Sequence, residues 1–150
     1  LAEVYAWQGR YKEAEELYQK SLRLTEKILG EEHPDTAMGY NNLASVYEDQ
    51  GKYREAEELY KKSLRLTEKI LGEEHPDTAT GYNNLAGVYA RQGKYKESII
   101  YYLKAYKIGV AKLGWNHPVA QIYFKNLEML YTENYPEEDF KQFLEEAMRD

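Results

Sequence analysis

Cysteine is absent from this sequence of 150 residues, and histidine occurs only three times. Without cysteine there is neither a disulfide framework nor a thiolate metal site. This absence is typical of a reducing compartment, so we expect a cytoplasmic protein. No apolar run approaches the roughly 18 residues of a membrane-spanning helix, so we expect no membrane partner. The formal net charge of −6 argues against a broad nucleic-acid-binding surface.

A period of 42 residues organises the sequence. Residues 10–51 match residues 52–93 at 35 of 42 positions, and a looser third copy starts at Lys94. Such periods are typical of arrays of small structural units. The pattern of residues in each unit predicts two helices. Pro34 suits a first helical turn and Gly51 suits a helix end, while a second helix is expected from about residue 53 to residue 71. No segment shows the alternation typical of strands.

A His-Pro pair recurs between the units. "LGEEHPDTA" occurs at 29–37 and 71–79, and a divergent "LGWNHPVA" occurs at 113–120. His33, His75 and His117 are too far apart to share an ion, and no nearby His or Cys completes a ligand set, so we expect no metal. "HPD" is also the tripeptide of J-domains, where it occurs once, in a different bundle. We expect the imidazoles to pack or cap locally at helix starts.

The stretch "YNNLASVYEDQGKYREAEELYKKSL" resembles a tetratricopeptide repeat. The family pattern is filled by Tyr40, Leu43, Ala44, Tyr47, Gly51, Tyr53, Ala56, Tyr60 and Ser63. The usual period is about 34, whereas the 42-residue period, with "LG..HPD.A" and "NNLA", resembles the kinesin-light-chain type. The resemblance covers residue 1 to about residue 134. It implies an all-α fold: a right-handed α-α superhelical solenoid of helix hairpins with a concave inner face and a C-terminal capping helix.

We expect one solenoid domain over residues 1–150: a partial repeat at 1–33, repeats at 34–75 and 76–117, and a degenerate repeat with a cap at 118–150. Leu1 aligns with Leu43, which lies in mid-helix. We therefore expect a fragment of a longer array, whose uncapped N-terminal face promotes self-association. At the other end, residues 136–139 predict a helix start, and the cap is expected to have an apolar face of Phe140, Phe143, Leu144 and Ala147.

Seven positions differ between the two full copies, and four of them (38/80, 45/87, 48/90 and 49/91) fall on one face of the first helix, opposite its apolar stripe. The resemblance implies that this face lines a groove that binds a partner peptide or helix. The candidate groove residues are Met38, Asn41, Asn42, Ser45, Glu48, Asp49, Thr80, Asn83, Asn84, Gly87, Ala90, Arg91, Ile122, Lys125, Asn126, Met129 and Glu133, with Glu3, Ala6 and Trp7 from the partial unit.

Asparagine amides both donate and accept hydrogen bonds, so a row of them can hold an extended peptide backbone. Two alternatives stay open. The differences can be drift at exposed positions, and Asn42, Asn84 and Asn126 can bond between helices. Some arrays of the family grip a C-terminal carboxylate with a Lys/Arg/Asn clamp, but Asn41 and Ser45 stand at the Lys and Asn positions of that clamp, which departs from the pattern.

The expected function is therefore protein–protein interaction. The alternative is a structural spacer or self-assembling array, natural or idealised, with no groove ligand. No Ser/His/Asp set and no glycine-rich phosphate loop is present, so we expect neither an enzyme nor a cofactor.

Overall fold

The computed structural model describes residues 9–150 and divides into two compact units. The first unit extends to Glu73 and the second covers Glu74–Asp150. Within residues 9–150 every regular element is an α-helix. The first unit holds α2 (Tyr11–Leu29), α3 (Pro34–Asp49) and α4 (Tyr53–Leu71). The second unit holds α5 (Pro76–Arg91), α6 (Tyr95–Leu113), α7 (Pro118–Asn134) and α8 (Phe140–Arg149).

The helix boundaries follow the repeated turn residues, as predicted. α3, α5 and α7 each begin at a proline that follows a histidine, because the missing proline N–H has no partner in a first turn anyway. Gly51 and Gly72 follow the ends of α3 and α4 with φ of 78° and 94°. Since only glycine adopts this left-handed region without steric cost, the chain can reverse there.

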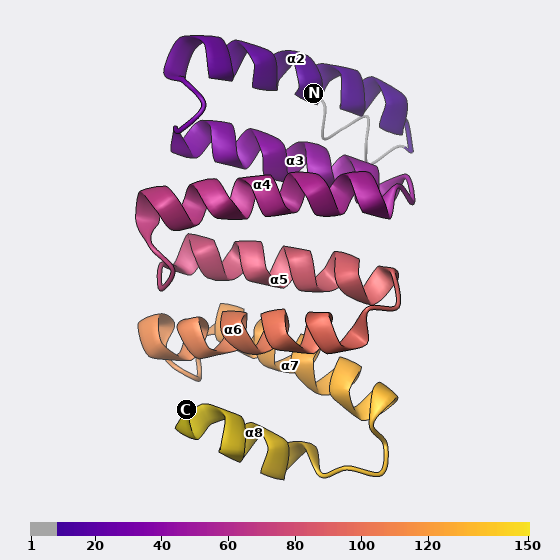
Figure 1. The fold of residues 1–150 in the computed structure, drawn as a ribbon, viewed down its shortest axis with the longest axis vertical. Coiled ribbons are helices and arrows are strands. Elements are labelled where there is room, and N and C mark those ends of the chain that lie inside the picture. Colours follow the sequence, from indigo (N-terminus) through magenta and orange to yellow (C-terminus); the bar gives the residue numbers. More distant parts are fainter. Residues whose placement is uncertain (1–8) are drawn as a thin grey trace. The chain divides into compact units, whose positions relative to one another are not determined.

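In the first unit, α3 lies between α2 and α4 and packs against both (Figure 1). Leu22 of α2 and Tyr40 and Leu43 of α3 form a buried cluster, which Leu59 and Leu66 of α4 cover. The apolar stripe predicted for the first helix is therefore the face that packs against its neighbours. A single hairpin could not bury this stripe alone.

In the second unit, α6 packs against both α5 and α7. Ile99 of α6 and Leu127, Leu130 and Tyr131 of α7 form the buried cluster at the C-terminal end. Three α8 side chains pack against this cluster: Phe140, Phe143 and Leu144. The face of α8 predicted to be apolar is thus the face that covers the last hairpin.

Of residues 136–139, predicted to start the last helix, only Asp139 takes part in the helix start, as its N-cap. The helix begins at Phe140, because the Asp139 carboxylate caps it by accepting hydrogen bonds from the backbone N–H groups of Lys141 (2.9 Å) and Gln142 (3.3 Å). The preceding residues form a turn in which Glu138 N donates to Tyr135 O (3.1 Å). Glu138 also accepts a hydrogen bond from the Tyr131 hydroxyl, which fixes this turn against α7.

The division into units falls between Glu73 and Glu74, two residues before the expected boundary of the repeats 34–75 and 76–117. The single-domain organisation, the repeat boundaries and the handedness of the superhelix stay predictions. No helix within residues 9–150 is both long enough and apolar enough to cross a membrane.

Candidate protein-interaction faces

The first-helix face of the first unit is open to solvent. On α3, Met38 is 61% exposed, Ser45 and Asp49 are exposed, and Asn41, Asn42 and Glu48 are half-buried. The opposite face of the same helix carries the buried residues Tyr40, Leu43 and Ala44. Three of the four residues of the predicted stripe are thus buried, whereas Tyr47 is half-buried and Val46, outside the stripe, is buried as well.

Acidic residues on this face influence a buried tyrosine of α4. Burial raises the pKa of Tyr60 strongly, and the negative charges of Glu48 and Asp49 raise it further, while a hydrogen bond with the Ser45 side chain acts in the opposite direction. Three of the candidate residues thus form the surroundings of one phenol. The α3 face is acidic around it, because no basic residue lies in the last turn of α3.

In the second unit, two polar contacts join the first helices of consecutive repeats. The Asn126 Nδ2 of α7 donates a hydrogen bond to Asn83 Oδ1 of α5 (3.0 Å). One turn along, the hydroxyls of Thr80 and Tyr123 lie 3.2 Å apart and share a hydrogen bond. The alternative that the asparagine of position 126 bonds between helices is therefore confirmed, with Asn83 as its partner.

Apolar side chains flank these contacts on α7. Ile122 is 53% exposed and Met129 is 61% exposed, and they lie seven residues apart, on one side of the helix. Lys125 between them is also exposed. The remaining candidates of this unit are exposed or half-buried, namely Asn84, Gly87, Ala90, Arg91 and Glu133. The α7 face therefore offers apolar anchors beside one cation.

Sequence reasoning missed Tyr123, which is 4% exposed and stands where the earlier copies have Gly39 and Gly81. Space for its ring comes from Gly109 of α6, where a Cβ would lie 3.1 Å from Tyr123 Cδ2. The earlier copies have threonine at the position of Gly109. In the third copy a glycine is thus replaced by a large residue, Tyr123, and a threonine by Gly109. These two opposite changes in size were the signal that could have identified Tyr123.

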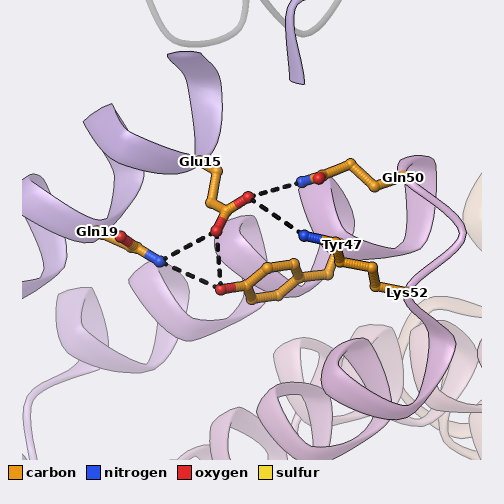
Figure 2. Close-up of polar contacts among 5 residues, drawn as sticks. All are labelled: Glu15, Gln19, Tyr47, Gln50 and Lys52. Atoms are coloured by element: carbon orange, nitrogen blue, oxygen red, sulfur yellow. Dashed lines mark hydrogen bonds and ion pairs between the residues drawn. The ribbon is translucent and has the colours of Figure 1, made fainter. Parts of the chain in front are cut away.

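Figure 2 shows a polar network between α2 and α3, apart from the candidate face. Tyr47 OH donates to Glu15 Oε1 (3.2 Å) and Gln50 Nε2 donates to Glu15 Oε2 (3.0 Å). Gln19 Nε2 contacts both Glu15 Oε1 (3.3 Å) and Tyr47 OH (3.2 Å), and Lys52 Nζ lies 3.9 Å from Glu15 Oε2. One carboxylate with three uncharged donors and one cation therefore fastens α2 to α3 and to the turn that follows it.

The three histidines cap helices. Nδ1 of His33, His75 and His117 accepts a hydrogen bond from the backbone N–H two residues later at 3.1, 3.0 and 3.1 Å. This confirms the predicted local role. Across residues 9–150, no group of three or more His, Cys, Asp or Glu side chains is placed to hold a metal ion.

A pocket of about 270 Å³ lies in the first unit and contains none of the candidate groove residues. Several of its polar side chains have partners: Lys69 pairs with Glu32, Lys62 Nζ lies 4.4 Å from the centre of the Tyr40 ring, and Tyr40 donates a hydrogen bond to Glu26. We assign no ligand to it. Its lining consists of Glu31, Glu32, Tyr40, Lys62, Arg65, Leu66 and Lys69.

Glu3, Ala6 and Trp7 lie outside the described residues, as does the aligned position of Leu1.

Repeated helix hairpins, with a buried stripe on one side of each first helix and an open face on the other, define an α-solenoid protein. The chain belongs to the tetratricopeptide repeat family, whose profile matches residues 1–69 and 37–109. Repeats of this family generally mediate protein–protein interactions, and the fold is typically a non-catalytic module.

Solved structures point to the kinesin-light-chain type of repeat. One similar structure shows nearly identical TPR-like repeats of a kinesin light chain from Podosopora anserina. Its sequence is 28% identical to this chain, and the TM-score is 0.82 over 89% of this chain and 64% of that one. BtubC (BKLC) from P. vanneervenii is 26% identical, with a TM-score of 0.82 over 99% of this chain and 58% of that one. This chain thus spans about three fifths of the length of these structures. A search of curated protein sequences found no significant match.

Proposed function

We propose that the first-helix face of the second unit, on α5 and α7, binds a peptide or helix of a partner protein, and that the first-helix face of α3 in the first unit does so as well. The observation that carries the proposal is the pair of contacts between α5 and α7, Asn83 with Asn126 and Thr80 with Tyr123. They hold polar groups in a fixed place beside the exposed side chains of α7. A preorganised face of this kind loses little conformational freedom when a ligand binds.

The paired amides keep capacity for a ligand. An asparagine amide has two N–H donors and two lone pairs on its oxygen, and the contact at 3.0 Å uses one donor of Asn126 and one lone pair of Asn83. Both residues are half-buried, so the remaining groups are near solvent. A peptide group, which also donates and accepts once, suits such a pair.

The side chains around the amides suggest the composition of the partner. Ile122 and Met129 provide apolar contacts, while Arg91 and Lys125 carry positive charge and Glu133 negative charge. A ligand with apolar anchors and mixed charge fits these residues better than a strongly acidic one. The departure from the carboxylate-clamp residues at Asn41 and Ser45 agrees with this composition.

A peptide-display selection on the chain tests the proposal. We expect an enriched motif that binds at least ten-fold more weakly to the Asn41→Ala/Asn83→Ala double variant, and equally well to a Glu58→Ala control on the second helix. Thermal unfolding of each variant separates lost binding from lost folding, because Asn83→Ala also removes the contact with Asn126. A motif retained in full by the folded double variant would contradict the proposal.

A structural or self-assembling role is the second candidate, and one observation on α2 favours self-assembly. Leu24 and Ile28 are 57% and 68% exposed, whereas their equivalents Leu66 and Ile70 in α4 are half-buried. Exposed apolar stripes of this kind promote association. Sedimentation at increasing concentration should show association that a Leu24→Glu/Ile28→Lys variant abolishes, and a monomer at millimolar concentration would exclude self-assembly. The cytoplasmic location stays a prediction.

A further inference from the structure

The second helix of the third copy has lost more acidic residues than basic ones. Glu58 and Glu73 of the preceding copy are replaced by Ile100 and Trp115. Three of the five basic positions persist, since Arg54, Lys62 and Arg65 correspond to Lys96, Lys104 and Lys107, whereas Lys61 and Lys69 are replaced by Leu103 and Ala111. Helix α6 therefore contains four lysines and one glutamate, for a net charge of +3, whereas α4 of the preceding copy contains five basic and four acidic residues, for a net charge of +1. This charge lies in a chain whose formal net charge is −6.

These residues share one face of α6. We define the basic–apolar stripe as Lys96, Ile100, Lys104, Lys107 and Ala111 of α6, together with Trp115 in the turn that follows the helix. The helical members recur at intervals of three or four residues, which places them on one side of the helix. The buried residues of α6 lie on the opposite side: Ser98, Ile99, Ala105, Tyr106 and Gly109.

The apolar members of the stripe are exposed and its cations lack acidic partners. Ile100 is 52% exposed and Trp115 is 67% exposed. Among residues 9–150, no carboxylate forms an ion pair with Lys96, Lys104 or Lys107. Lys104 Nζ lies over two stacked rings instead, at 5.4 Å from the centre of Tyr82 and 5.2 Å from that of Tyr101.

The turn that carries Trp115 is well held. Gln121 Nε2 donates a hydrogen bond to Trp115 O, and His117 N donates to Gly114 O at 3.1 Å. The backbone beneath the exposed indole is thus fixed before any ligand binds. Tryptophan in such a position is typical of the residues that dominate binding energy in protein interfaces.

We propose that the basic–apolar stripe of α6 is a second docking surface, and that it binds an acidic segment of a partner protein that carries an aromatic or aliphatic side chain. Unpaired lysines select the acidic charge, and Ile100 and Trp115 provide apolar contact area. A protein segment fits better than an anionic membrane, because the chain as a whole is acidic and would be repelled by such a membrane. This surface lies on a second helix, so it is distinct from the first-helix faces proposed above.

The repeats themselves supply a conservative variant. Ile100→Glu/Trp115→Glu restores the residues that the preceding copy has at these positions, so folding should be unaffected. Ile122→Thr restores the residue of the preceding copy on the first-helix face and serves as the matched control. Random 16-residue peptides would be selected by display on the wild-type chain and counter-selected on the Ile100→Glu/Trp115→Glu variant. The surviving peptides would be titrated by fluorescence anisotropy.

The proposal expects net-acidic peptides with at least one aromatic or aliphatic residue. They should bind Ile100→Glu/Trp115→Glu at least ten-fold more weakly, bind Ile122→Thr unchanged, and weaken between about 50 and about 300 mM salt, as screened charges do. Peptides that depend on Ile122 instead would support the first-helix face and overturn this proposal. Survivors that are neutral or basic, or the absence of survivors, would also overturn it. So would sedimentation of the chain with phosphatidylserine vesicles, but not with phosphatidylcholine vesicles, if the double variant abolished it, because the stripe would then be a membrane surface.

Discussion

At the residue scale, the recurring histidine stabilises a helix start without chemistry of its own. Its Nδ1 accepts the backbone N–H of the residue after the proline, which satisfies one of the first-turn donors that a helix leaves unpaired. Ser, Thr, Asp and Asn more commonly fill this role. The histidine and the proline act together, because proline removes one unpaired donor and the imidazole satisfies another.

The variant His75→Ala should lower the free energy of unfolding by about 1 kcal/mol, the usual cost of removing an N-cap side chain. His75→Asn should retain most of the stability, since asparagine is a strong N-cap residue. Urea denaturation of the three proteins measures both effects. Equal losses for the alanine and asparagine variants would show that the imidazole acts by packing rather than by capping.

The role of these histidines was predictable from the sequence because it depends on local chain geometry alone. The position of the histidine directly before the proline that starts a helix was enough to predict a capping role. The pairing of Asn126 with Asn83 was not predictable to the same degree. Two adjacent asparagines in each "NN" could turn toward a neighbouring helix or a ligand, and only the packing of α5 against α7 decides between them.

At the element scale, one carboxylate fastens α2 to α3 (Figure 2). Glu15 accepts hydrogen bonds from Tyr47 and Gln50, and its side chain is 19% exposed. Removing an acceptor from such a site leaves partly buried donors without partners. The connection between these helices is therefore polar at one end and apolar in the middle, where Leu22 and Tyr40 meet.

We expect Glu15→Ala to destabilise the protein by about 1–3 kcal/mol, the usual cost of unsatisfied buried donors. The neighbouring Glu16 is exposed, so Glu16→Ala is the matched control and should change stability by less than about 0.5 kcal/mol. Thermal and urea unfolding give both values. A loss of the same size in the two variants would mean that general charge, rather than the network, is responsible.

The contact of α6 with α7 depends on an exchange of size between Gly109 and Tyr123. Gly109→Thr introduces the residue that the earlier copies have at this position, but its Cβ would lie 3.1 Å from the tyrosine ring. We expect a loss of about 1–3 kcal/mol, as for other overpacked sites. The Gly109→Thr/Tyr123→Gly double variant, which restores the earlier pair, should be more stable than the sum of the single effects predicts. Additive effects in this double-mutant cycle would disprove the coupling.

The helices and their turns were predictable from the sequence because the repeat displays each signal several times. The prediction was less accurate where the repeat ends, since only Asp139 of the predicted start caps the last helix. Residues 136–139 carry proline and three acids, which are typical of a first helical turn, yet the helix begins at Phe140. The hydrogen bond from Tyr131 to Glu138 is a tertiary contact, and no periodic signal encodes it.

At the scale of the whole molecule, the buried tyrosines limit the stability of the folded state at alkaline pH. The sequence contains 16 tyrosines. Burial is the main cause that raises the pKa of Tyr40, Tyr47, Tyr106 and Tyr123. Burial and the neighbouring Glu138 raise the pKa of Tyr131 to about 12. These tyrosines lie in both units, so we expect a high pH to destabilise both.

The sign of this effect follows from the preferred protonation state. A phenol whose pKa is higher in the folded state than its value of roughly 10 in the unfolded chain binds its proton more tightly when folded. Its contribution to stability is fully present below pH 10 and is lost as the pH rises through the folded value. We therefore expect a constant melting temperature up to about pH 9 and a steep fall between about pH 10 and about pH 12.

Circular dichroism followed together with phenolate absorbance along this pH range checks the prediction. The buried phenols should ionise in the same cooperative step in which helicity is lost. In Tyr131→Phe, which cannot ionise, the melting temperature should fall less between pH 10 and pH 12 than it does in the wild type, although loss of the bond to Glu138 lowers stability at neutral pH. Complete ionisation of all tyrosines at about pH 10 with full helicity would show that these phenols are open to solvent, and would contradict the packing of both hairpin cores.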